Sequence, residues 1–112
     1  MTTHPTPDIA ATEARALLAA GDAVALDVRE PYEWHSGRIA GALHIPLDEL
    51  GRRLHELPAG KRVVAVCRSG NRSAAVTRAL RQRGYDVLNL AGGLLAWDSH
   101  GLPLEPAHGR VA

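Results

Sequence analysis

Residues 64–76 read VAVCRSGNRSAAV: an apolar run, a polar turn with a glycine, and the start of a helical pattern. The apolar run ending near Val66 is typical of a buried strand, and 73–84 has the spacing of an amphipathic helix. Between them stands Cys67, the only cysteine of the chain. These residues predict a sharp strand–turn–helix connection, in which Gly70 can adopt the positive φ that the turn requires.

The same alternation of strand and helix extends along the chain in both directions. Short apolar runs predict strands at 23–28, 43–46, 61–66 and 85–90. Helical spacing, with glycine or proline stops, predicts helices at 8–21, 30–37, 47–57, 73–84 and 92–101. This alternation indicates an α/β fold with a mainly parallel central sheet covered by helices on both faces. Ligands of such sheets bind beyond the carboxyl ends of the strands, where Cys67 is expected.

Length and composition limit the domain organisation and the class of function. The chain has 112 residues, a net charge of +1 and 22% charged residues, which suits one domain and excludes a basic nucleic-acid stripe. We expect a flexible N-terminus at 1–7, a single domain at 8–105 and a flexible C-terminal tail at 106–112. The sequence shows neither a signal peptide nor a run that could span a bilayer. With one cysteine no internal disulfide is possible, so we expect a cytoplasmic protein with a reduced thiol.

The turn around Cys67 can stabilise a thiolate. Making a thiolate dominant at neutral pH requires roughly 2.7 kcal/mol, of which a helix dipole supplies only about 0.3–2 kcal/mol. Backbone N–H groups that point into the turn are expected to supply the rest, helped by Arg68 and Arg72. The alternative is a cysteine that serves only as a small buried apolar side chain, which would not need a polar turn with two arginines.

Neither a metal nor a cofactor is expected. The six histidines are spread over different predicted elements and the chain ends, without the spacing of a metal site. A thiol that is already ionised needs no histidine as a base.

Three segments resemble, in the right order, the motifs of the rhodanese-like domain family in its single-domain form. LDVREPYEWHSGRIAGALHIP is similar to the N-terminal motif, VVAVCRSGNRSA to the active-site strand and loop, and GYDVLNLAGGLLAWDSHGLPL to the C-terminal motif. The resemblance covers nearly the whole chain. It implies a sulfurtransferase of the thiosulfate type, whose cysteine takes up a sulfane sulfur as a persulfide and passes it to a nucleophile.

The resemblance also implies the residues of the site. Cys67 matches the residue that holds the sulfur, and Asp27 and Arg29 match supporting positions beneath or beside the loop. Asp27 is expected to pair with an active-site arginine or with Arg29, or to accept loop N–H groups. The active-site loop and anion-binding residues are expected to be Arg68, Ser69, Gly70, Asn71, Arg72 and Ser73.

Donor, acceptor and two other functions stay open at this point. The arginine beside the thiol favours an anionic donor such as thiosulfate or glutathione persulfide, and the acceptor could be cyanide, a small thiol, thioredoxin or a sulfur-carrier protein. The first alternative function is a non-catalytic or regulatory protein-interaction module. The second is a cysteine phosphatase or arsenate reductase, but phosphatases place five residues between cysteine and arginine, whereas four separate Cys67 from Arg72.

Overall fold

The computed structural model describes residues 7–112, so the expected flexible N-terminus lies almost entirely outside the described residues. One sheet is built from β1 (Asp8–Ile9), β2 (Ala23–Asp27), β3 (Leu43–His44), β4 (Arg62–Val66) and β5 (Val87–Leu90). The strand order is β1-β5-β4-β2-β3, and each of these pairings is parallel. The predicted α/β fold with a mainly parallel sheet is confirmed.

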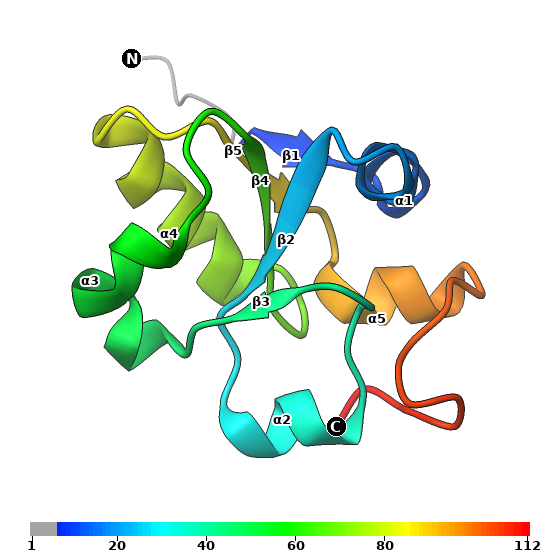
Figure 1. Ribbon diagram of the computed structural model, residues 1–112. Helices are drawn as coiled ribbons and strands as arrows, with labels where there is room; N and C mark the ends of the chain where they lie inside the picture. Colours follow the sequence, from blue (N-terminus) through cyan, green and yellow to red (C-terminus); the bar gives the residue numbers. More distant parts are fainter. Residues whose placement is uncertain (1–6) are drawn as a thin grey trace, which may run out of the picture.

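Helices cover both faces of the sheet. They are α1 (Ala11–Ala19), α2 (Pro31–Ser36), α3 (Leu50–Arg53), α4 (Asn71–Gln82) and α5 (Gly93–Ser99), with 3-10 turns η1 (Leu47–Glu49) and η2 (Leu54–Glu56). Figure 1 shows α1 and α5 on one side of the sheet, α3 and α4 on the other, and α2 beyond the carboxyl end of β2. In the described part of the chain, no helix has the length and apolar character needed to cross a membrane.

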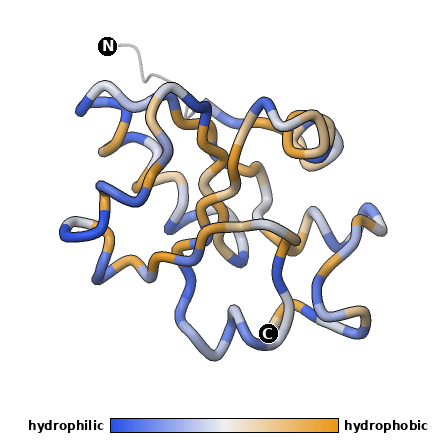
Figure 2. The backbone as a smooth tube through the Cα atoms, in the orientation of Figure 1, coloured by the Kyte–Doolittle hydropathy of each residue, from blue (hydrophilic) through white to orange (hydrophobic). Residues whose placement is uncertain are grey.

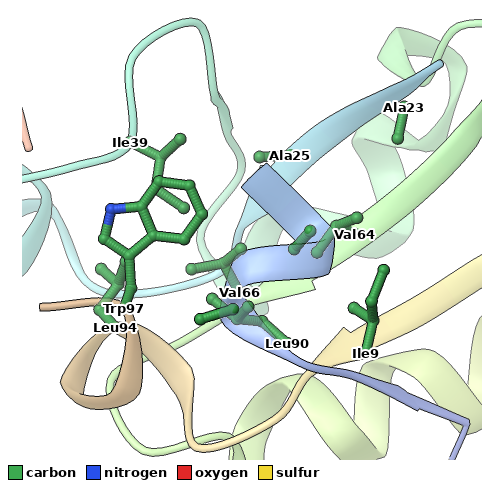
Figure 3. Close-up of a cluster of buried hydrophobic side chains, with 11 residues drawn as sticks. Ile9, Ala23, Ala25, Ile39, Val64, Val66, Leu90, Leu94 and Trp97 are labelled. Carbon is green, nitrogen blue, oxygen red and sulfur yellow. The ribbon is translucent and has the colours of Figure 1, made fainter. Parts of the chain in front are cut away.

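The core is divided by the sheet into two clusters, and β4 contributes to both. Alternate side chains of a strand point to opposite faces, so the chain around β4 supplies each cluster in turn. The cluster on the side of α1 and α5 (Figure 3) includes Ile9, Ala25, Ile39, Val64, Val66, Leu90, Leu94 and Trp97. The cluster on the side of α3 and α4 includes Leu26, Leu50, Val63, Ala65, Cys67, Val76 and Leu80. Figure 2, coloured by hydropathy, accordingly shows that apolar residues are concentrated in the central strands.

The prediction of a helix from residue 8 is wrong at its start. Asp8 and Ile9 form β1, which pairs with Asn89 and Leu90 of β5, and α1 begins at Ala11. A two-residue edge strand is too short to show any hydrophobic period. The strand β1 is defined by its backbone hydrogen bonds to β5, and the sequence carries no signal of these bonds.

The single amphipathic helix predicted at 47–57 is divided into η1, α3 and η2. The backbone leaves the α-helical range at Arg53, with φ −117° and ψ 12°. The segment still buries Leu50 and Leu57 against the second cluster, whereas Leu47 is exposed.

After α5 the chain returns to α2. Arg38 and Glu105 form an antiparallel bridge with N–H···O distances of 2.9 and 2.7 Å. The Arg110 N–H donates to the Ser36 carbonyl at 2.9 Å, and Figure 1 shows the last residues beside α2. The tail at 106–112 therefore lies near the carboxyl end of the sheet, and its flexibility stays a prediction.

Candidate active site

The turn after β4 contains a glycine whose backbone is in the left-handed conformation. Cys67 follows directly on Val66, and Gly70 has φ 100° and ψ −7° just before α4 begins at Asn71. A Cβ at Gly70 would lie 3.2 Å from the backbone nitrogen of Gly92. Both the positive φ and this close approach favour glycine, as the sequence predicted.

Three groups that can donate a hydrogen bond face the sulfur of Cys67. The Gly70 N–H donates to Sγ at 3.1 Å and the Ser73 N–H at 3.4 Å. The Ser73 hydroxyl oxygen lies 3.2 Å from the same sulfur. Cys67 is fully buried, yet it is not an ordinary apolar core residue, because three polar groups face its sulfur. Hydrogen bonds to an anion are stronger than those to a neutral group, so this arrangement suits a thiolate.

The outer side of the turn is held by α5. The N–H groups of Leu94 and Leu95 donate to the carbonyls of Cys67 and Arg68 at 2.9 and 3.0 Å. Gly93 lies so close that a Cβ there would come within 2.5 Å of the Arg68 carbonyl oxygen. The carbonyls at the start of the turn are therefore bound on the side of α5.

The remaining loop residues divide into an exposed and a buried set. Arg68, Ser69 and Asn71 are exposed, whereas Gly70 and Ser73 are buried with the sulfur. Arg68 donates from Nε to the Ala112 carbonyl at 2.9 Å. The predicted loop residues thus lie together at the carboxyl end of β4, and Arg68 is exposed there.

Comparison with known proteins identifies the family. A family model described as Rhodanese-like domain matches residues 10–100. The chain belongs to the rhodanese-like domain family. It is 43% identical over 89 residues to a sulfurtransferase of Allochromatium vinosum, covering 79% of this chain and 83% of that protein.

Two solved structures show the same rhodanese-like fold. A rhodanese-related protein from Thermoplasma volcanium is similar with a TM-score of 0.81 and 34% identity, over 87% of this chain and 95% of that one. A thiosulfate sulfurtransferase from Pseudomonas aeruginosa is similar with a TM-score of 0.82 and 36% identity. The second match covers 95% of this chain but 21% of the other, so this rhodanese-like domain corresponds to one part of that protein.

In this rhodanese-like domain, Arg72 is bound by α2. Its Nη1 and Nη2 donate to Oε1 and Oε2 of Glu33 at 2.8 and 2.9 Å. The hydrogen bond from Arg72 is the largest cause of the lowered pKa of Glu33, and it raises the pKa of Arg72 well above its ordinary value. Both terminal nitrogens of Arg72 are engaged, which leaves Arg68 as the more accessible of the two loop arginines.

Asp27 and Arg29 form a buried pair at the end of β2. Nε and Nη2 of Arg29 donate to the two carboxylate oxygens of Asp27 at 2.9 and 2.8 Å, and both residues are at most 1% exposed. Arg29 also donates to the carbonyls of Glu33 and Gly37 at 3.1 and 2.8 Å. Of the partners expected for Asp27, the structure shows Arg29. The backbone N–H of Arg29 also donates to Oδ1 of Asp27 at 3.1 Å. The pair thereby fixes α2, which in turn positions Arg72.

Asn89 of β5 is a residue of the site that the sequence analysis missed. Its Oδ1 lies 2.6 Å from the Ser73 hydroxyl, and its Nδ2 donates to Asp8 and to the Gly70 carbonyl at 3.0 and 3.3 Å. A signal was present, because an asparagine within the apolar strand pattern VLNL must find buried partners. The pattern does not say which partners these are.

Proposed function

We propose that this chain is a sulfurtransferase that moves a sulfane sulfur from an anionic donor to a nucleophilic acceptor through a persulfide on Cys67. One observation carries the proposal: the hydrogen bonds that Gly70 and Ser73 direct at the Cys67 sulfur at the carboxyl end of the sheet. The family and the sulfurtransferase relative support it.

The first half-reaction loads the sulfur. The Cys67 thiolate attacks the outer sulfur of a donor such as thiosulfate or a low-molecular-weight persulfide, and a new S–S bond forms. The bond that joined this sulfur to the rest of the donor breaks, and sulfite or a thiolate leaves with the electron pair. The electron pair of the thiolate forms the new bond, and the transferred sulfur keeps its own negative charge as the outer persulfide sulfur. Because this sulfur is already at the sulfane oxidation level, no external oxidant is needed.

The second half-reaction returns the enzyme to its starting state. An acceptor such as cyanide, a small thiol or a sulfur-carrier protein attacks the outer sulfur, and Cys67 leaves as a thiolate. The hydrogen bonds that stabilise the thiolate make it a good leaving group. With a single cysteine in this chain, release of the sulfur is assigned to an external nucleophile.

Arg68 is assigned to attraction of the donor. Arg68 is exposed and follows Cys67 directly in the sequence, whereas both terminal nitrogens of Arg72 donate to Glu33. A phosphatase is disfavoured by the spacing of the loop, because four residues separate Cys67 from Arg72 where phosphatases place five. A cytoplasmic location is retained as a prediction.

Mass spectrometry tests the proposal directly. Incubation with thiosulfate or glutathione persulfide should add one sulfur atom to the wild type, and cyanide should remove it. Cys67→Ser should take up none. Absence of the adduct with every donor would favour the protein-interaction module, and hydrolysis of an aryl phosphate that depends on Cys67 would favour the phosphatase.

A further inference from the structure

The hydrogen bonds around the sulfur continue beyond Ser73 to Asn89. The Ser73 hydroxyl oxygen lies 3.2 Å from the Cys67 sulfur and 2.6 Å from Oδ1 of Asn89. A hydroxyl carries one proton, so Ser73 can donate to only one of these two atoms at a time. The sulfur and the amide oxygen therefore compete for the same proton.

The orientation of the Asn89 amide follows from its other contacts. Its Nδ2 lies 3.0 Å from a carboxylate oxygen of Asp8 and 3.3 Å from the Gly70 carbonyl oxygen. Both of these atoms only accept, so the amide nitrogen faces them and Oδ1 faces Ser73. Oδ1 also only accepts. With a protonated thiol, Ser73 thus donates to Asn89, and the thiol S–H can donate to the Ser73 oxygen.

We propose that Asn89 is a positioning residue that draws the Ser73 hydroxyl proton away from the Cys67 sulfur whenever that sulfur loses its charge. This inference rests on the proposed persulfide chemistry. In the thiolate, the anionic sulfur is the stronger acceptor, so the hydroxyl turns to it and gives up its bond to Asn89. After the new S–S bond forms, the charge lies on the outer sulfur and the hydroxyl returns to Asn89.

The consequence is a bias in the loading step. The proton stays on Ser73 throughout, and only its direction changes. Asn89 keeps its bond to Ser73 in the thiol and in the persulfide, but loses it in the thiolate. Asn89 therefore disfavours the thiolate relative to both other states and promotes the loss of negative charge from the Cys67 sulfur as the new S–S bond forms.

The other charged groups near the site are present in every variant of the test described below, which changes only Ser73 and Asn89. They are Asp8 on β1, Asp27 on β2, Arg29 between β2 and α2, Glu33 on α2, Arg68 in the loop and Arg72 on α4. Because the test compares variants at two neutral positions, the direct contributions of these groups to the thiolate largely cancel.

The experiment is a double-mutant cycle on Asn89→Leu and Ser73→Ala. The ultraviolet absorbance of the thiolate is titrated with pH, with Cys67→Ala as the blank. With Ser73 present, Asn89→Leu should raise the thiolate-to-thiol ratio about fivefold and so lower the pH of the titration midpoint. This factor corresponds to the free-energy contribution of one neutral hydrogen bond. In the Ser73→Ala background the shift should fall to less than about a third of that in pH units.

Two further variants complete the design. Thr77→Val removes another buried hydroxyl of α4, one that donates to the Ser73 carbonyl at 2.8 Å, and should leave the midpoint unchanged. If thermal unfolding shows that Asn89→Leu does not fold, the smaller Asn89→Ala takes its place. A midpoint that rises, or that shifts equally in both backgrounds, overturns the inference, because Asn89 would then act through its bonds to Asp8 and to the Gly70 carbonyl and not through Ser73.

The titration is independent of sulfur transfer, so the two proposals can fail separately. If the wild type forms no persulfide with any donor, the proposed function fails, while the titration still decides whether Asn89 competes for the Ser73 proton. If the persulfide forms but the cycle shows no coupling, the function stands and the role of Asn89 is refuted.

Discussion

Replacement of Glu33 by glutamine should destabilise the protein near neutral pH but not in acid. Glutamine can still accept the Glu30 N–H, which lies 3.0 Å from Oε1 of Glu33. The second oxygen becomes an NH₂ group, which cannot accept from Arg72. The paired hydrogen bonds of 2.8 and 2.9 Å are thereby reduced to one bond with a neutral group.

The size of the loss follows from the burial of the pair. A hydrogen bond to a charged group contributes about 1.5–3 kcal/mol when buried, whereas an exposed ion pair contributes about 0–1 kcal/mol. The side chain of Glu33 is 4% exposed and that of Arg72 is 36% exposed, so solvent screens one partner. We expect a loss of about 1–2 kcal/mol, or a decrease in Tm of about 4–8 °C for a domain of this size.

The pH dependence has a definite sign. The pKa of Glu33 is lowered in the folded protein from its ordinary value of 4.5, chiefly by the hydrogen bond from Arg72. The unfolded chain therefore binds this proton first as the pH falls. The stabilisation by Glu33 is complete above 4.5 and is lost as the pH falls through the folded-state pKa.

Thermal unfolding followed by circular dichroism, from neutral pH into acid, checks this prediction. The difference in Tm between wild type and Glu33→Gln should shrink as the pH falls. Glu13→Gln, at an exposed glutamate in the first turn of α1, is the matched control and should change Tm little at any pH. A difference that persists unchanged into acid, or that is absent at neutral pH, would refute the reasoning.

Three further predictions concern the loop and its supports. Gly93→Ala should lower the free energy of unfolding by about 1–3 kcal/mol and lower the persulfide yield, because the new Cβ meets the loop carbonyl. Gly51→Ala, where a Cβ would lie in open space, should change neither; thermal unfolding and mass spectrometry measure the two effects. Arg68→Gln should raise the KM for thiosulfate about two- to fivefold in initial-rate assays, whereas Arg52→Gln, 72% exposed on α3, should not; an unchanged KM would remove Arg68 from donor binding. Asp27→Asn should lower the free energy of unfolding by about 3–5 kcal/mol, because it leaves a buried arginine without its counter-charge. Urea unfolding measures this loss, and a value below about 1 kcal/mol would contradict the prediction.

Much of the fold could be predicted because its elements carry local signals. The buried strands read as continuous apolar runs, and glycine and proline mark the helix ends, so the alternation that defines a parallel sheet was visible. The edge strand β1 was not visible, because two residues carry no period. The break of the 47–57 segment at Arg53 depends on backbone geometry that the apolar spacing does not encode.

The site divides in the same way. Cys67 and Gly70 were predictable because a turn between a strand and a helix imposes its own residue types. The partners of Arg72 and Ser73 were not, since Glu33 and Asn89 lie 39 and 16 positions away along the chain. Only the packing of α2 and β5 around the loop brings them together.

The attachment of the loop to α5 has a consequence for protein engineering. The carbonyls of Cys67 and Arg68 are held by the amides of Leu94 and Leu95, so the first two peptide units of the loop are tethered to another helix. Residues 69–72 carry no such tether to α5, and a loop lengthened by one residue should be grafted there. The sulfur would then keep its place while the ring of amides widens toward the size that a tetrahedral oxyanion fills.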